Sequence, residues 1–192
     1  MISLRDYDRT VHEIFDFVDR VVKTMQDSGA DYRIVGGISV FLHIAQVDPT
    51  HARLSRDIDI AVKRGDLPSI QAAAERNGFE YKQEPKHGQD TFTLIDRQNG
   101  KPRADVHLIM AGEKAREDHP EPVPPIGEIC LTADGVKIAP LFDVVHMMLS
   151  SYRLKDRVHV QDMDSSGLIN GEVESRLSRV LRDRLAEIRR AE

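Results

Sequence analysis

The chain has 192 residues, of which 40% are apolar and 31% charged, a balance typical of one globular domain with a small helical appendage. A formal charge of −5 and a pI near 5.9 argue against bulk electrostatic binding of nucleic acid, and 5% aromatic residues provide no broad base-stacking platform. The single cysteine excludes an intrachain disulfide. Because no apolar run is long enough to span a membrane and the N-terminus lacks a signal-peptide core, we expect a cytoplasmic protein.

Hydrophobic spacing, turn residues and prolines divide the chain into helices and strands. Four prolines within 120–125 predict a linker or a wrapping loop there. In chain order, we expect a helix over 7–28, a strand over 32–35, a helix over 38–45, a strand over 56–62, a helix over 66–77, strands over 79–82, 91–95 and 104–110, a hairpin of 129–131 and 136–138, and helices over 141–155 and 172–190. This order predicts an α+β (mixed α/β) fold with a helical C-terminal portion.

A glycine pair, Gly36 and Gly37, stands between the strand over 32–35 and the helix that follows. Without side chains at these positions, backbone N–H groups and the helix N-terminus can approach a phosphate. Ser39 adds a hydroxyl in the first turn of that helix. The pair therefore indicates a phosphate cradle, and the alternative is a tight turn with close packing.

Two carboxylates, Asp57 and Asp59, lie two residues apart inside an apolar run. In a strand they point to the same face, where two adjacent like charges are unfavourable without a cation, so we interpret them as ligands of Mg²⁺. A third acid, Asp105, lies in the other apolar run that contains a carboxylate. It would complete the metal site or deprotonate an attacking hydroxyl, with His107 on the same strand face.

The glycine pair, the run Arg-Leu-Ser-Arg-Asp-Ile-Asp-Ile over 53–60 and the later strand aspartate resemble the DNA polymerase β-like nucleotidyltransferase superfamily. Within it the chain is similar to the small AbiEii-like (abortive-infection) nucleotidyltransferases, many of them toxins of toxin–antitoxin pairs. The resemblance implies a short mixed sheet flanked by helices, and Mg²⁺-dependent transfer of a nucleoside monophosphate from an NTP to a hydroxyl. By this resemblance Gly36, Gly37 and Ser39 hold the triphosphate, Asp57, Asp59 and Asp105 bind metal, Asp105 is also the base, and Arg53 and Ser55 contribute to the nucleotide site.

The helix predicted over 141–155 extends the resemblance through Arg153, Lys155 and Asp156. The two cations would neutralise the β- and γ-phosphates while the aspartate orients them, and the alternative is a solvated, charged helix end. Met148 stands where the helix of the family normally carries a lysine. This departure motivates a second hypothesis, a catalytically inactive nucleotide-binding or regulatory protein of the same fold.

The prediction is therefore a nucleotidyltransferase with its catalytic core over 1–125 and a hairpin plus helical portion over 126–192. The sequence leaves the acceptor open among RNA such as tRNA, protein and small molecules. An antitoxin protein is a further candidate partner. The arginine-rich helix over 172–190 is either a solvated amphipathic face or a docking surface for tRNA or a partner protein.

Overall fold

The computed structural model of the chain describes residues 4–48, 57–86, 89–96, 105–127, 129–132 and 134–191. No helix within these ranges is both long and apolar enough to cross a membrane. The elements are α1 (Leu4–Ser28), β1 (Tyr32–Val35), α2 (Gly36–Val47), β2 (Ile58–Val62), a 3-10 turn η1 (Arg64–Asp66), α3 (Leu67–Arg76), β3 (Phe79–Lys86), β4 (Gln89–Asp96), β5 (Asp105–Met110), β6 (Cys130–Leu131), β7 (Lys137–Ile138), α4 (Leu141–Ser151), α5 (Leu154–Ser165), α6 (Gly171–Arg176) and α7 (Arg179–Arg190).

The strands form one seven-stranded mixed sheet in the order β3-β4-β5-β2-β1-β7-β6. β1 and β2 pair antiparallel, whereas β2 pairs parallel with β5 and β1 pairs parallel with β7. The predicted mixed sheet flanked by helices is therefore confirmed. The short hairpin of β6 and β7 extends this same sheet, and the division of the chain at 125/126 stays a prediction.

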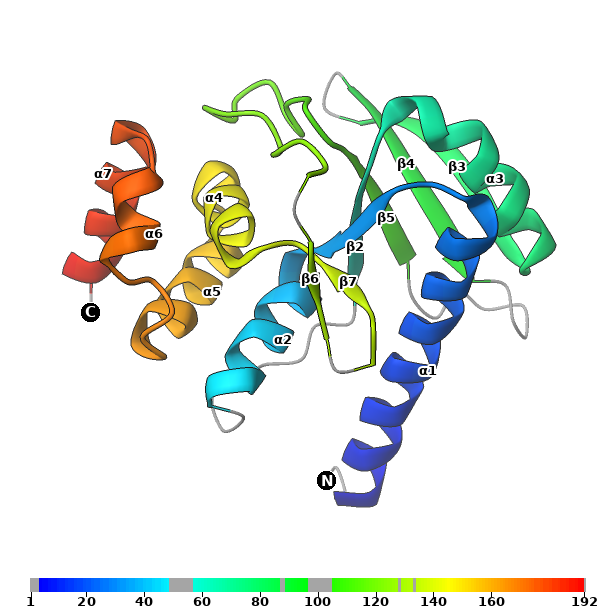
Figure 1. The fold of residues 1–192 in the computed structure, drawn as a ribbon, viewed down its shortest axis with the longest axis horizontal. Coiled ribbons are helices and arrows are strands. Elements are labelled where there is room, and N and C mark those ends of the chain that lie inside the picture. Colours follow the sequence, from blue (N-terminus) through cyan, green and yellow to red (C-terminus); the bar gives the residue numbers. More distant parts are fainter. Residues whose placement is uncertain are drawn as a thin grey trace.

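Helices cover the sheet from two sides, and each side has its own apolar core (Figure 1). On one side α1 and α3 pack against the buried residues of β3, β4 and β5. On the other side α2, α4, α5 and α7 form a second core with Val35 and Ala61 from the central strands. The central strands β1 and β2 are thus held between two helical layers, and their ends meet the N-terminus of α2.

The predicted helix over 141–155 is wrong in its length, because the chain turns sharply at Tyr152. α4 ends at Ser151, Tyr152 adopts a left-handed backbone with φ 55°, and α5 begins at Leu154. The tyrosine ring is held from α7, since its hydroxyl donates to the Arg184 carbonyl oxygen at 3.3 Å and the Arg184 guanidinium lies over the ring at 4.8 Å. A tertiary contact therefore stops the helix, and α5 had no counterpart in the predicted elements.

The predicted helix over 172–190 is also two helices, because Ser178 starts a new one by accepting a hydrogen bond from Leu181 N at 3.4 Å. Several arginines of this segment contact other parts of the chain, so their charges are used in contacts within the protein. Arg176 lies over the Phe142 ring, Arg184 donates to the Leu149 and Ser150 carbonyl oxygens, and Arg189 pairs with Asp164 and Glu174.

Candidate functional site

A cavity of about 440 Å³ opens where β2 and β5 face the first turn of α2 and the start of α5. The loop between β5 and β6 forms another of its walls. The structure thus brings together groups that lie more than 100 residues apart in the sequence. Six residues predicted for the site line this cavity: Gly36, Gly37, Asp57, Asp59, Arg153 and Lys155.

Gly36 is where the backbone comes closest to the acid pair. Its φ of +67° lies in the left-handed region, and a Cβ built there would lie 2.1 Å from Asp59 Oδ2. Only glycine leaves this space to the carboxylate. The first turn of α2 carries no acidic residue and its cap residue makes no side-chain cap hydrogen bond, so the helix N-terminus beside Asp59 is suited to an anion such as a phosphate.

We expect Gly36→Ala to destabilise the fold. The left-handed backbone alone costs an alanine about 1–2 kcal/mol, and the new methyl group would also displace Asp59. Gly29→Ala is the matched control, because Gly29 has φ +69° and nothing within 4 Å of a built Cβ. Thermal melting should show a small loss for Gly29→Ala and a larger one for Gly36→Ala; equal losses would contradict the close approach to Asp59.

Asp59 is the strand acid of the site whose environment disfavours its charge. Burial raises the pKa of the Asp59 carboxyl, and the neighbouring charges of His107, Lys155 and Arg153 only partly oppose this effect. His107 is the residue directly beside Asp59 on β5, in the parallel register of the two strands. Asp57 is exposed at the rim of the same cavity. The two carboxylates are therefore unequal, one half-buried on the strand and one exposed.

Other predicted residues lie elsewhere or outside the described ranges. Asp105 is the first residue of β5, half-buried and outside the set that lines the cavity, so its role as third ligand and base stays a prediction. Ser39 is fully buried in α2, does not line the cavity, and its Oγ has no hydrogen-bond partner within the described residues. Arg53 and Ser55 lie outside the described residues.

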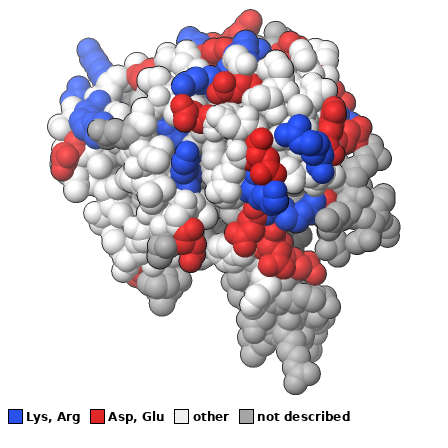
Figure 2. Space-filling view, turned by 45° about the vertical axis from the view of Figure 1, so that its right-hand side comes forward, with Lys and Arg blue, Asp and Glu red and all other residues white. Residues whose placement is uncertain are grey.

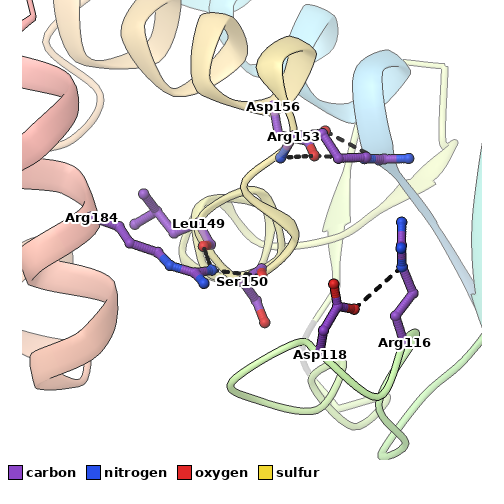
Figure 3. A network of polar contacts seen from close by, with 7 residues as sticks. All are labelled: Arg116, Asp118, Leu149, Ser150, Arg153, Asp156 and Arg184. Carbon is purple, nitrogen blue, oxygen red and sulfur yellow. Dashed lines mark hydrogen bonds and ion pairs between the residues drawn. The ribbon is translucent and has the colours of Figure 1, made fainter.

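Arg153 is fixed by Asp156 at the start of α5 (Figure 3). Its Nε donates to Asp156 Oδ2 at 2.8 Å and its Nη2 donates to Oδ1 at 3.2 Å, a two-point contact with a buried carboxylate. The sharp turn at Tyr152 is what points this helix start at the cavity. A guanidinium held at a set orientation can receive phosphate oxygens with little loss of side-chain freedom.

The loop over 111–127 adds residues that the sequence did not single out. It is a wrapping loop, since Gly112 N donates to the Val123 carbonyl oxygen at 2.9 Å and Val123 N donates to Glu113 O at 2.8 Å. Arg116 and His119 of this loop line the cavity. Burial lowers the pKa of His119 and so disfavours its charged form. The lysine and arginine side chains that line the cavity are Arg116, Arg153 and Lys155. The proline-rich stretch over 120–125 was the local sequence signal that predicted the loop. It gave no indication that Arg116 would line the cavity.

The donor set fits a hard divalent cation that shares its ligands with a substrate. Within the described ranges, no three His, Cys, Asp or Glu side chains are arranged to hold a metal ion by themselves. Asp57 and Asp59 supply two carboxylates to one wall of the cavity, and the missing side chain of Gly36 makes room for the second of them. Mg²⁺ is commonly held by one or two carboxylates, with phosphate oxygens and water completing its shell. This site therefore suits a metal that arrives with a nucleotide.

Comparison with known proteins establishes the fold. No protein-family model matches the chain, and no curated protein matches it either. Among solved structures it is similar to the antibiotic-resistance factor ANT(2'')-Ia in solution, with 16% identity, a TM-score of 0.53 and 91% of each chain covered. It is also similar to ANT(2'')-Ia in complex with adenylyl-2''-tobramycin, with 13% identity, a TM-score of 0.51, and 92% of this chain and 97% of that one covered.

A third similar structure is an antigenic nucleotidyltransferase-like protein from Paracoccidioides brasiliensis. It is 15% identical, with a TM-score of 0.54, and the match covers 94% of this chain and 89% of that one. None of these structures is described as AbiEii-like, so membership of that subgroup and a toxin role stay predictions. The chain has the mixed α/β fold of nucleotidyltransferase-like proteins.

Proposed function

We propose that the protein transfers a nucleoside monophosphate from an NTP to an acceptor hydroxyl and requires Mg²⁺. The observation that carries the proposal is the cavity in which Asp57 and Asp59 face the Gly36–Gly37 turn and a wall of cations. Acids for a metal, a helix N-terminus for phosphate and cations for a leaving pyrophosphate are the parts that this reaction needs. The similarity of fold to ANT(2'')-Ia, which was solved in complex with adenylyl-2''-tobramycin, supports the same reaction class.

In this proposal each group of the chain has one task. Asp57 and Asp59 would hold the Mg²⁺, which lowers the cost of the negative charge that builds on the phosphates during transfer. The first turn of α2 receives the triphosphate through its backbone N–H groups. Arg153 and Lys155 stabilise the departing pyrophosphate. Asp105 is proposed to take the proton of the acceptor hydroxyl.

Incubation of the protein with each α-labelled NTP, with and without Mg²⁺, tests the proposal. The reaction is offered total RNA, protein and small-molecule fractions as acceptors. Label that enters one fraction only with Mg²⁺, and is lost in Asp57→Asn at unchanged melting temperature, supports transfer. Full activity of Asp57→Asn would refute the assigned metal site.

Met148 favours a second candidate function, a nucleotide-binding or regulatory protein that does not turn over. It lines the cavity at the position where the resemblance predicts a lysine. Binding of an NTP without release of AMP or pyrophosphate would support this candidate. A toxin held by an antitoxin is compatible with either function, and a stable complex with a partner protein would test it.

We expect Arg116 to compensate for the missing lysine by binding the terminal phosphates. It extends from the loop toward the same side as Arg153 (Figure 3), and both line the cavity. Its only described ion pair is with Asp118, at 3.3 Å in exposed surroundings, and its Nε makes no hydrogen bond within the described residues. Such an exposed pair holds an arginine weakly, so the guanidinium is available to a phosphate.

The expected result for Arg116→Ala is a loss of about tenfold or more in ATP affinity, while AMP affinity stays the same, because only ATP carries the terminal phosphates. Calorimetric titration with Mg²⁺ and each nucleotide measures both affinities. Arg179→Ala is the control, since it removes the same charge from a side chain that is 91% exposed on α7. Equal losses of AMP and ATP affinity would place the arginine at the nucleoside instead.

A further inference from the structure

A second cavity of about 300 Å³ adjoins the first over β4 and β5. The two cavities have four wall residues in common, namely Thr91, His107, Ile109 and Ala115, so they lie side by side. The route from the second cavity to the acid pair is short, because His107 is the register partner of Asp59.

Strand order places this second cavity opposite the phosphate groups. Along the sheet, β4 and β5 lie on one side of β2, which carries Asp59, and β1 lies on the other side. The Gly36–Gly37 turn follows β1, and α5, which starts next to Arg153, packs against α2. Arg116, Arg153 and Lys155 line the first cavity and not the second, so a nucleotide bound by the turn and these cations has its pyrophosphate outside the second cavity. Since attack at phosphorus is in line with the leaving group, the acceptor must approach from the side of β5 and β4.

The charges of the second cavity do not suit a polyanion. The charges of Arg64 and Glu113 offset each other in a two-point ion pair. Arg64 Nε donates to Glu113 Oε1 at 2.7 Å and Arg64 Nη2 donates to Glu113 Oε2 at 2.6 Å. Asp90 and Lys114 are the other charged wall residues, one of each sign, so the wall has a formal charge of zero. Figure 2 shows acidic and basic side chains beside one another on the face that it draws. Nucleic acid requires an excess of cations, which this wall does not have.

The same wall offers no aromatic face to a base. Phe92 is 3% exposed, and the guanidinium of Arg64 lies over its ring at 5.4 Å from the centroid. Recognition of an RNA end depends on stacking of unpaired bases on such faces. Thr91 Oγ1 donates to the Glu84 carbonyl oxygen at 2.9 Å and Asp90 Oδ2 accepts from Gln83 Nε2 at 2.9 Å, so these two side chains offer a ligand their remaining acceptor positions. A volume of about 300 Å³ corresponds to a small-molecule site.

We infer that the second cavity is the acceptor site and that its acceptor is a small, uncharged or cationic hydroxyl compound. The inference rests on the proposed function. In the reaction the acceptor oxygen forms a bond to the α-phosphorus, the bond to the pyrophosphate oxygen breaks, and the hydroxyl proton leaves to Asp105, the base of the proposed function. The products are a phosphodiester of the acceptor and pyrophosphate.

The test uses the full chain, Mg²⁺, α-labelled NTPs and a cell extract sorted into RNA, protein, and cationic, neutral and anionic metabolites. We expect label in the cationic or neutral metabolites. Label that enters mainly RNA, protein or anionic metabolites would overturn the inference while leaving nucleotidyl transfer intact. Absence of labelled acceptor and of pyrophosphate in every reaction would instead refute the proposed function, so the two failures are distinguishable.

Asp90→Arg then tests the location, because it places two units of positive charge and added bulk in the second cavity alone. We expect at least a tenfold rise in KM for the labelled metabolite fraction, with less than a twofold change in ATP affinity. Asp183→Arg makes the same change on a side chain of α7 that is 75% exposed and is expected to alter neither value. If Asp90→Arg melts early, Asp90→Asn gives a smaller change of the same kind. An unchanged KM in the folded variants would overturn the location.

Discussion

Asp59→Asn is expected to abolish transfer and, at the same time, to stabilise the protein at neutral pH. The carboxylate is a proposed metal ligand, and its loss should lower activity by about 10³-fold or more. Burial raises the pKa of the same carboxyl, which means that its charged form is costly in the folded state. Asparagine fills the same space without this charge. Gains of this kind at active sites are about 1 kcal/mol, or about 2–4 °C in melting temperature for a chain of this size.

The pH dependence gives the sign of this effect. The folded pKa of Asp59 is raised above the ordinary value of 3.8, so between these two values the folded state binds more protons than the unfolded state. The cost of the charge is therefore fully present above the raised folded pKa and disappears as the pH falls toward the unfolded pKa. The stability advantage of Asp59→Asn should shrink in the same window, which melting curves recorded without Mg²⁺ across acidic to neutral pH would measure.

Asp57→Asn is the matched control for this stability effect. Asp57 is exposed at the rim of the cavity, so its replacement relieves no burial of charge. Both variants should lose transfer, and only Asp59→Asn should gain stability. A lower melting temperature for Asp59→Asn would mean that the carboxylate makes stabilising contacts which outweigh its burial.

The strands around the site were predictable because their signals are local. The apolar run around Asp57 and Asp59 and the glycine pair after β1 lie within 30 residues of one another, and β1 was predicted with its exact bounds. Alternation within β5 also placed Asp105 and His107 on one strand face. Register was not predictable in this way. It is the parallel pairing of β2 with β5 that sets His107, and not Asp105, beside Asp59.

The prediction of the C-terminal helices was wrong where contacts between residues distant in sequence determine the backbone conformation. The break at Tyr152 depends on Arg184 from α7, which no window of the sequence around the tyrosine contains. Arg116 reaches the cavity because hydrogen bonds between residues 112–113 and 123 fold its loop back over the sheet. The start of α5 after this break and the loop over 111–127 together supply Arg153, Lys155 and Arg116 to the site. A sequence pattern can indicate which residue types a site needs. Which of these residues lie together in the cavity depends on the packing of distant parts of the chain.

Arg33 is the other position where a single change should have a large effect, here on the fold. Its side chain is 3% exposed between β1 and α4, and Nη1 donates to Asp143 Oδ2 at 2.5 Å. Its Nη2 also donates to the Pro125 carbonyl oxygen, in the loop that carries Arg116. We expect Arg33→Met to cost about 3–5 kcal/mol of unfolding free energy, since it leaves a largely buried carboxylate without its cation. Urea unfolding followed by circular dichroism measures this loss.

A double variant separates the charge from the position of the loop. Arg33→Met combined with Asp143→Leu removes both charges, so most of the lost stability should return. The bond to Pro125 stays absent in this variant, and nothing replaces the link between β1 and the loop. If that link holds Arg116 over the cavity, the double variant should be stable and still bind ATP less tightly than the native chain. A double variant with native ATP affinity would show that the loop holds its place through the backbone bonds at 112 and 123 alone.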